Sequence, residues 1–293
     1  MGTSRRWVIE SMNTVFSLVV AGAVPADVDD VVAAIEHDFA TIESRLSVFR
    51  PDSEISQWRA GRLPDAQLSA DVREVIAACD KVEQVTGGLF SARREGGYDP
   101  TGYVKGWALA RAARRLDESG VDSYCLNGGG DIIARGVNPE GESWRLGIAH
   151  PYRPGELATI VSTETTPALR ATPPKEGNRR TIAVATSGTG ERGSHIVNPL
   201  NGWRPVNSTV TVVGDDIAMA DMAATAALAA GRDGPQACAA LVQRLGLEAF
   251  GFDEDRHPWW TDGMPILAPR AGIFDGKFPS FGGVAAEPPG WFS

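Results

Sequence analysis

The chain has 293 residues, of which 43% are hydrophobic and 22% are charged, so it is a globular protein that can bury a full core as one large domain or two joined ones. Its net charge of −9 and its lack of a basic run argue against a nucleic-acid partner. Cys79, Cys125 and Cys238 form no CxxC motif, which argues against a disulfide framework or a thiolate metal cage. We interpret them as small buried apolar residues.

The first predicted element is a strand. The apolar run VFSLVVAGAV at residues 15–24 is too short to cross a bilayer, and it has neither a basic flank directly before it nor a cleavage-like ending. The chain as given shows no membrane span, no export leader and no lipobox cysteine. This predicts a cytoplasmic protein, unless a leader has been removed.

Helices follow the strand. Residues 28–46 place apolar side chains three or four positions apart, which predicts a core helix with one apolar face. The residues with this spacing are Val31, Ile35, Phe39, Ile42 and Leu46. A short helix after them is expected to be capped by Asp52 or Ser53, and two longer helices are expected over residues 72–86 and 101–119, each followed by glycine.

The second half of the chain alternates strands and helices. Two helices are expected at 215–231 and 235–246. Strands are expected at 122–126, 131–135, 144–150, 158–163, 180–187 and 208–214. The tail is rich in Gly, Pro and Phe without periodicity, so we predict one domain over residues 1–268 and an irregular tail over 269–293.

Three glycines stand between two of these strands, in the sequence LNGGGDIIARG. A tight hairpin with glycines at positive φ accounts for two of them. Three in a row, followed by Asp131, leave more bare backbone than a turn needs, and bare N–H groups are what flat or anionic ligands approach. A plain loop and a ligand-binding loop both fit this segment.

The late helix MADMAATAALAAG carries Asp221 and Thr225 four residues apart, hence on one face, among apolar neighbours. A buried carboxylate needs a partner, and a carboxylate with a hydroxyl one turn away offers the hard oxygen ligands that suit Mg²⁺. The alternative is that Asp221 faces solvent and Thr225 bonds back to the carbonyl of residue 221.

Two further segments suit an anionic ligand. In YDPTGYVKGWA, Thr101 is expected to cap a helix, Gly102 permits close approach to its backbone, and Lys105 lies in the first turn, where free N–H groups and an ammonium favour an anion. A solvated surface lysine is the alternative. In TSGTGERGSHIVNPLNGW, hydroxyls and glycines surround His195, which is either structural or catalytic. No GxGxxG, P-loop, GxSxG or HExxH pattern is present.

Six segments, taken in chain order, resemble the ApbE-like FAD:protein FMN transferases. They are RLSVFRPDSEIS, TGGLF, DPTGYVKGWA, LNGGGDI, the TSG…HIVNP…G run and the helix with Asp221 and Thr225. The resemblance covers the chain from about Trp7 to Gly263. It implies an α+β fold of helices and mostly antiparallel sheets, arranged as a single compact unit with two lobes.

This resemblance implies a bacterial flavin transferase that uses Mg²⁺ to cleave FAD at its pyrophosphate. FMN then passes to a threonine or serine hydroxyl of an acceptor protein, and AMP is released. Phosphoryl transfer depends on positioning and charge neutralisation more than on covalent catalysis, so a metal with few protein ligands beside a lysine suits it. FAD and an acceptor protein are therefore the expected partners.

The same resemblance assigns site residues. The metal would be held by the side chains of Asp221 and Thr225 and by the carbonyl of Gly102. His195 and Asp221 would be catalytic, with acid–base help to the acceptor hydroxyl from His195. The residues implied near FAD are Met12, Phe49, Phe90, Ser91, Asp99, Lys105, Gly128, Gly129, Asp131 and His195.

Three positions depart from the family's pattern. Asn13 stands where a glycine is usual, Ser91 where an acid follows TGG-x-Phe, and Asn198 where an acid follows the histidine segment. These changes are expected to reshape the substrate pocket more than the metal site. They leave two other functions open, namely Mg²⁺-dependent hydrolysis of FAD to FMN and AMP, and flavin binding without turnover. Many members of the family are exported to the bacterial periplasm.

Overall fold

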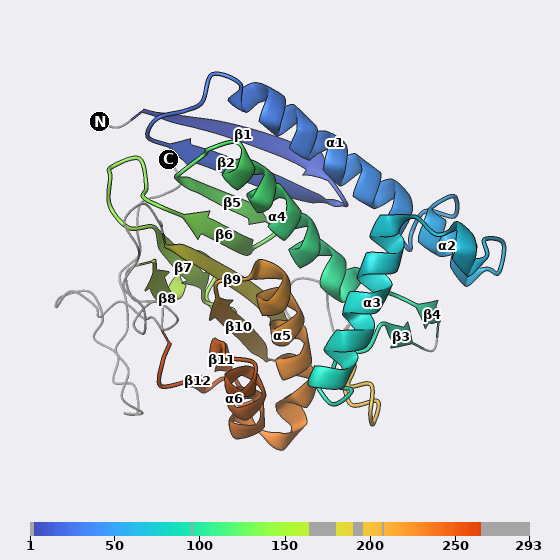
Figure 1. The fold of residues 1–293 in the computed structure, drawn as a ribbon. Coiled ribbons are helices and arrows are strands. Elements are labelled where there is room, and N and C mark those ends of the chain that lie inside the picture. The colour runs from blue at the N-terminus through green and yellow to red at the C-terminus, as the bar shows by residue number, and fades with distance from the viewer. Residues whose placement is uncertain (1–2, 95, 164–179, 190–195, 207, 265–293) are drawn as a thin grey trace.

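The computed structural model describes residues 3–94, 96–163, 180–189, 196–206 and 208–264 (Figure 1). One eight-stranded sheet runs in the order β1-β2-β5-β6-β9-β10-β11-β12, with every neighbouring pair antiparallel. Its strands are β1 (Ser4–Ser11), β2 (Thr14–Ala21), β5 (Tyr124–Gly128), β6 (Asp131–Arg135), β9 (Thr181–Gly188), β10 (Thr209–Gly214), β11 (Glu248–Phe252) and β12 (Pro258–Trp260).

Two hairpins stand outside this sheet, and the helices lie mainly along one side of it. The hairpins are β3 (Arg93–Arg94) with β4 (Gly97–Tyr98), and β7 (Arg145–Ala149) with β8 (Leu157–Ser162). The helices are α1 (Val28–Leu46), α2 (Glu54–Arg59), α3 (Ala70–Val85), α4 (Thr101–Glu118), α5 (Ile217–Ala230) and α6 (Pro235–Arg244), with short 3₁₀ turns η1 (Asp65–Gln67) and η3 (Gly231–Asp233).

The sheet is covered on both faces, but unevenly. On one face α1 packs on β1, α4 on β5 and β6, α5 on β9 and β10, and α6 on β11 (Figure 1). On the other face, Leu146 and Ile148 of β7 share an apolar cluster with Ile182 and Val184 of β9. This arrangement confirms the predicted α+β class with mostly antiparallel sheets. The division into two lobes stays a prediction, and the predicted boundary at residue 268 and the tail fall outside the described residues.

Local sequence explains the first elements. The strand predicted in the apolar run is β2, and all five predicted core residues of α1 are buried, with Phe39 stacked on Phe16 of β2 at 4.2 Å between ring centroids. Ser53 is the cap of α2, because its hydroxyl accepts a hydrogen bond from the N–H of Ser56 (3.1 Å). The prediction missed β1, whose signal is the β-favouring run Trp7, Val8 and Ile9 between charged residues.

The prediction of buried cysteines is confirmed for two of the three. Cys79 and Cys238 are buried and Cys125 is half-buried, and all three are free thiols. Burial raises the pKa of each of these thiols to about 12. They are therefore protonated at neutral pH, which is the unreactive form.

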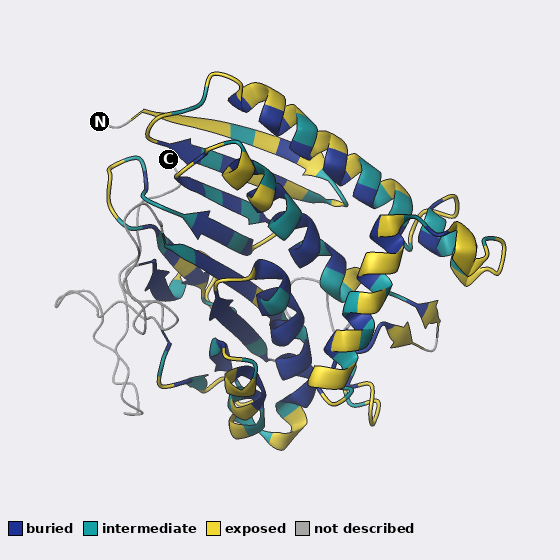
Figure 2. Ribbon diagram, in the orientation of Figure 1, coloured by how far each residue is buried: buried dark blue, intermediate teal, exposed yellow. Residues whose placement is uncertain are grey.

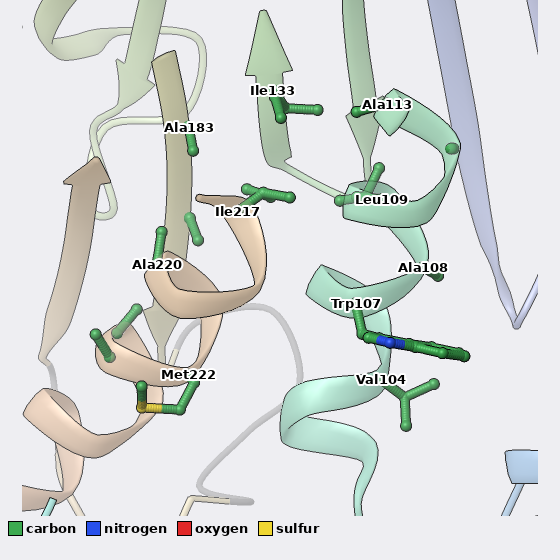
Figure 3. Packing of buried hydrophobic residues seen from close by; sticks show 14 of the residues in the cluster. Val104, Trp107, Ala108, Leu109, Ala113, Ile133, Ala183, Ile217, Ala220 and Met222 are labelled. Carbon is green, nitrogen blue, oxygen red and sulfur yellow. The ribbon is translucent and has the colours of Figure 1, made fainter. Parts of the chain in front are cut away.

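Helix α5 is the central helix of the fold. Twelve of its fourteen residues are buried, and eight of the fourteen are alanines. A helix that is apolar on all sides must be covered on all sides, and Figure 3 shows α5 between β9 and α4, with Ile217 next to Leu109 of α4. The small side chains let the neighbouring backbones come close, which sets the geometry of the candidate site.

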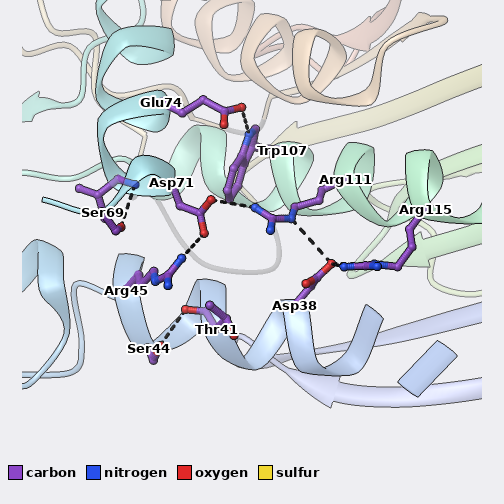
Figure 4. A network of polar contacts seen from close by, with 11 residues as sticks. Asp38, Thr41, Ser44, Arg45, Ser69, Asp71, Glu74, Trp107, Arg111 and Arg115 are labelled. Atoms are coloured by element: carbon purple, nitrogen blue, oxygen red, sulfur yellow. Dashed lines mark hydrogen bonds and ion pairs between the residues drawn. The ribbon is translucent and has the colours of Figure 1, made fainter. Parts of the chain in front are cut away.

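A polar network joins α1, α3 and α4 (Figure 4). Asp71 of α3 pairs with Arg45 of α1 (2.5 Å) and Arg111 of α4 (2.9 Å), while Asp38 of α1 pairs with Arg115 of α4 (2.7 Å). Both carboxylates are buried, and buried charges need such partners. The network therefore fixes three helices relative to one another.

We expect Asp71→Asn to lower the free energy of unfolding at pH 7 by about 1–3 kcal/mol, because two arginines lose a charged acceptor. Burial favours the neutral form of Asp71, but the hydrogen bonds and charges of Arg111 and Arg45 outweigh it and hold its pKa below 3.8. The stabilisation is thus complete above the unfolded pKa and disappears as pH falls through the folded pKa. Urea unfolding from pH 7 to pH 3 should show the difference between parent and variant shrink below about pH 4.

The control for this experiment is Asp52→Asn. Asp52 pairs with Arg50 through a side chain that is 71% exposed, so its replacement should not change the unfolding curve measurably. A constant difference between parent and Asp71→Asn across the whole pH range would contradict the assignment.

Candidate functional site

Asp221 of α5 lies against the first turns of α4. Its Oδ2 accepts a hydrogen bond from the N–H of Gly106 (2.9 Å), and the residue is only 5% exposed. A Cβ on Gly106 would lie 2.8 Å from the Cβ of Asp221, so the two helices touch here without intervening side chains. The alternative that Asp221 faces solvent is wrong.

Thr225 lies one turn further along the same face of α5. Its Oγ1 is 3.1 Å from the Oγ of Ser187 on β9, so its predicted alternative bond back to residue 221 is not the contact that holds it. A Cβ on Gly102 would lie 3.8 Å from the Cγ2 of Thr225. Gly102 thus faces the methyl group of Thr225 as Gly106 faces Asp221, so the three residues predicted to hold the metal lie along one antiparallel helix contact. Their role as metal ligands stays a prediction.

Lys105 is held by a buried carboxylate. Its Nζ is 2.5 Å from the Oδ2 of Asp131, and their side chains are 22% and 1% exposed. The other oxygen of Asp131 accepts from the N–H of Thr186 on β9 (3.1 Å). The alternative of a solvated surface lysine is therefore wrong, and the ammonium is fixed in the first turns of α4.

The glycine loop forms a two-residue hairpin turn between β5 and β6. Gly129 and Gly130 have φ values of 61° and 93°, as a type I′ turn requires. Gly128 is needed for a different reason, because a Cβ there would lie 2.6 Å from the ring of Phe16. Packing accounts for Gly128, and the contact of Gly128 and Gly129 with a nucleotide stays a prediction.

A second hairpin turn lies beside the first. Met12 and Asn13 connect β1 and β2 with φ values of 54° and 55°, and a Cβ on Gly129 would lie 2.6 Å from the Oγ1 of Thr14. The N–H of Met12 donates to the Oε2 of Glu43 on α1 (2.9 Å). Asparagine tolerates positive φ, so the change from glycine at position 13 preserves the turn.

Asp99 is the hydrogen-bond acceptor at the start of α4. Thr101 is the first residue of α4 and Pro100 is its N-cap residue, so the predicted Thr101 cap is wrong. The Oδ1 of Asp99, one residue before the cap, accepts from the N–H (3.0 Å) and the hydroxyl (2.7 Å) of Thr101. These hydrogen bonds are structural, and the contact of Asp99 with FAD stays a prediction.

The remaining predicted residues are spread more widely. Phe90 is buried against Gly102, with its ring 3.2 Å from the position of a Cβ there, and Ser91 accepts from the N–H of Arg93 (3.1 Å). Phe49 is 76% exposed, which leaves its ring open to a flat ligand. His195 lies outside the described residues.

Asn198 and two hydroxyl residues of β9 lie around α5. The side-chain amide of Asn198 donates to the carbonyl of Ala229 at the end of α5 (2.9 Å), so this departure from the family's pattern supports the helix rather than reaching toward the candidate metal ligands. Sequence reasoning missed Thr186 and Ser187. Both belong to the TSG segment, which the sequence analysis interprets only as the surroundings of His195.

The donor atoms define the kind of site. Within the described ranges, no group of three or more His, Cys, Asp or Glu side chains is placed to hold a metal ion, which sets this site apart from zinc-type centres. A carboxylate, a hydroxyl and a lysine beside a helix start instead suit a magnesium ion and a phosphate-containing ligand. The site therefore has the features of a phosphoryl-transfer enzyme.

Comparison with known proteins identifies the family. The model of the ApbE family matches residues 12–95 and 91–250, so this chain belongs to the ApbE family. A relative from Vibrio cholerae, 30% identical over 151 residues, and one from Escherichia coli K12, 28% identical over 157 residues, are both named FAD:protein FMN transferase. These matches cover 48% and 50% of this chain but only 40% and 39% of the relatives. A Haemophilus influenzae relative of the same name is 22% identical over 72% of this chain and 76% of its own length.

Solved structures share the fold. The apo flavinyl transferase ApbE of Pseudomonas stutzeri has a TM-score of 0.69 at 20% identity and covers 89% of this chain and 96% of its own. The ApbE protein of Thermotoga maritima has a TM-score of 0.73 at 17% identity, and the match covers 89% of this chain and 97% of that protein's chain.

Among the described residues, no helix combines the length and apolar character needed to span a membrane.

Proposed function

We propose that this chain is a Mg²⁺-dependent transferase that moves FMN from FAD to a threonine or serine hydroxyl of an acceptor protein and releases AMP. The observation that carries the proposal is the contact of α4 with α5, which sets Asp221 against Gly106 and Thr225 against Gly102. Membership of the ApbE family and the names of its relatives support the flavin chemistry.

The oxygen atoms at this contact fit Mg²⁺, which takes few protein ligands and completes its shell with water and phosphate oxygens. In a regular helix the N–H of residue 106 would donate to the carbonyl of residue 102. The N–H of Gly106 also donates to Asp221, and a carbonyl oxygen with two lone pairs, such as that of Gly102, can face a cation in addition to accepting a helical hydrogen bond. When bound, Mg²⁺ would neutralise charge on the pyrophosphate oxygens.

The protein's own groups position the reactants. Lys105, oriented by Asp131, binds the pyrophosphate beside the start of α4. The hydroxyl oxygen of the acceptor forms a bond to the phosphorus of the FMN moiety, the bond from that phosphorus to the bridging oxygen breaks, and AMP leaves with the bridging oxygen. The hydroxyl proton passes to a base, and we assign that role to His195.

The test is incubation with FAD, Mg²⁺ and a candidate acceptor, followed by intact mass of the acceptor and chromatography of free nucleotides. We expect the acceptor to gain one FMN moiety and AMP to appear in equal amount. Chelation by EDTA should stop both, and added Mg²⁺ should restore both. Free FMN and AMP without an adduct would indicate hydrolysis instead, and bound but uncleaved FAD would indicate binding alone.

Lys105→Ala is expected to raise the Kd for FAD at least about tenfold, because a charge-assisted contact with phosphate contributes roughly 1.5–3 kcal/mol. It should also lower the free energy of unfolding, since Asp131 loses the ammonium that neutralises its buried charge. Flavin fluorescence titration and urea unfolding measure the two effects.

Two variants sharpen this experiment. Lys81→Ala removes an exposed lysine of α3 and should change neither quantity. Lys105→Ala combined with Asp131→Asn removes both charges and should be more stable than Lys105→Ala alone while binding FAD as weakly. Unchanged FAD affinity in Lys105→Ala would exclude the lysine from the pyrophosphate site.

A further inference from the structure

The outer edge of β1 has the properties of a pairing surface. β1 is an end strand of the eight-stranded sheet, and within the part of the chain that the structure describes it pairs with β2 alone. Its sequence SRRWVIES contains no proline or glycine, its pairing with β2 shows no register shift, and five of its eight residues are exposed (Figure 2). A strand edge of this length without proline, glycine or a bulge is a template for another strand that supplies counter-charges to its charged side chains.

The register with β2 shows which backbone groups face outward. Ser11 and Thr14 close a two-residue hairpin loop, and such a closing pair exchanges both of its backbone hydrogen bonds. Bonding alternates along the strand, so the odd-numbered residues of β1 bond to β2, and the bond from the N–H of Gly22 to the carbonyl of Thr3 (2.9 Å) continues this pattern. The N–H and C=O groups of Arg6, Val8 and Glu10 therefore point to the open edge.

The side chains of these three residues lie on the sheet face away from α1. The alternate residues Arg5 and Trp7 face α1, where both side chains bond to Asp29. Val8 is 69% exposed, and neither Arg6 nor Glu10 bonds to another side chain among the described residues. The open edge thus carries a basic, an apolar and an acidic side chain in a row.

We propose that this edge pairs antiparallel with β1 of a second copy of the chain, around a two-fold axis at Val8. Val8 then faces Val8, Arg6 faces Glu10 of the second copy, and Trp7 faces Ile9 on the helix side. Each pair formed by Arg6, Val8 and Glu10 exchanges two backbone hydrogen bonds. Opposite charges directly across a strand pair stabilise it, whereas like charges destabilise it.

Other registers fit less well. A register shifted by one residue would place the outward N–H and C=O groups of one copy opposite residues whose backbone groups already bond to β2. It would also place side chains of one sheet face opposite side chains of the other face. A slip that moves the axis to Arg6 would place Arg6 against Arg6 and leave Glu10 without a counter-charge. Because the sequence of the edge is complementary to itself in one register, it favours a second copy, with the symmetric interface of a two-fold dimer, over a strand of a different protein.

A charge exchange tests the register, with sedimentation equilibrium from micromolar to submillimolar concentration as the readout. The parent chain is expected to form a dimer. Arg6→Glu and Glu10→Arg should each raise the dimer Kd at least about tenfold, because each places like charges opposite one another twice. The double variant R6E/E10R restores opposite charges and should restore the dimer. Both positions are exposed, and circular dichroism checks that each variant is folded.

A matched pair of valine variants separates the edge from a general effect of added charge. Val8→Lys changes the axis residue and should dissociate the dimer, whereas Val206→Lys changes a valine that is 54% exposed and lies outside β1 and β2 and should not. A parent chain that stays monomeric at all concentrations would overturn the proposal. A double variant that fails to dimerise, or equal dissociation by Val8→Lys and Val206→Lys, would overturn it too.

Discussion

Asp221→Ala is expected to reduce Mg²⁺-dependent release of AMP from FAD by roughly 10³-fold or more, because a catalytic metal stabilises the transition state by several kcal/mol and Asp221 is the charged ligand that we propose at the contact of α4 with α5. AMP release is measured against Mg²⁺ concentration at saturating FAD. The loss should persist at high Mg²⁺ if the carboxylate is needed for correct coordination.

Two variants show that this loss comes from the metal rather than from the fold. Asp221→Asn keeps an oxygen to accept from the N–H of Gly106, so it should melt close to the parent while remaining nearly inactive. Thr225→Val keeps the branched shape and removes the hydroxyl, which water can replace in the octahedral shell, so its defect should be milder and should shrink as Mg²⁺ is raised. An unchanged Mg²⁺ dependence in Asp221→Ala would end the metal-site hypothesis.

Gly106→Ala is expected to damage both the fold and the activity. A Cβ at this position would lie 2.8 Å from the Cβ of Asp221, 2.9 Å from the Cα of Ala218 and 2.9 Å from the carbonyl oxygen of Ile217. Alanine's better helix propensity would favour the variant by roughly 1 kcal/mol, but two of the three contacts are with backbone that cannot turn aside. We therefore expect a net destabilisation of about 1–3 kcal/mol.

The same substitution should lower kcat/KM about 100-fold, because a shift of about 1 Å between catalytic groups can cost that much, and here α5 must move away from α4. Thermal melts and AMP release measure the two effects. Gly96→Ala is the control, since a Cβ at Gly96 meets nothing within 4 Å. A Gly106→Ala protein with the stability and activity of the parent would show that the helices have room to adjust.

Much of the local structure could be read from the residues. The spacing in α1 predicted its buried face, and the separation of Asp221 and Thr225 placed them on one face of a helix. The hairpin at Gly129 and Gly130 followed from the need for positive φ. Each of these inferences rests on backbone geometry within a few residues, where periodicity and steric preference decide the conformation.

Other inferences from the sequence needed correction. The hydroxyl of Thr101 was expected to cap α4, yet Asp99 accepts both hydrogen bonds there. Gly128 was grouped with the turn glycines, yet it accommodates the ring of Phe16 from β2. Residue type restricts which roles a position can take, and the neighbours brought by the fold select among them.

By itself, then, the sequence determined the helices, most of the central strands, the family resemblance and the residue types of the candidate site. Only the tertiary structure decided the partners, such as Lys105 with Asp131, Thr225 with Ser187 and Gly106 with Asp221, which are 115 positions apart. The physical reason is that an ion pair or a close helix contact depends on how the sheet and helices pack. That packing is set by the whole core. The periodicity of one segment shows which of its faces is buried, but it does not show which distant segment packs against that face.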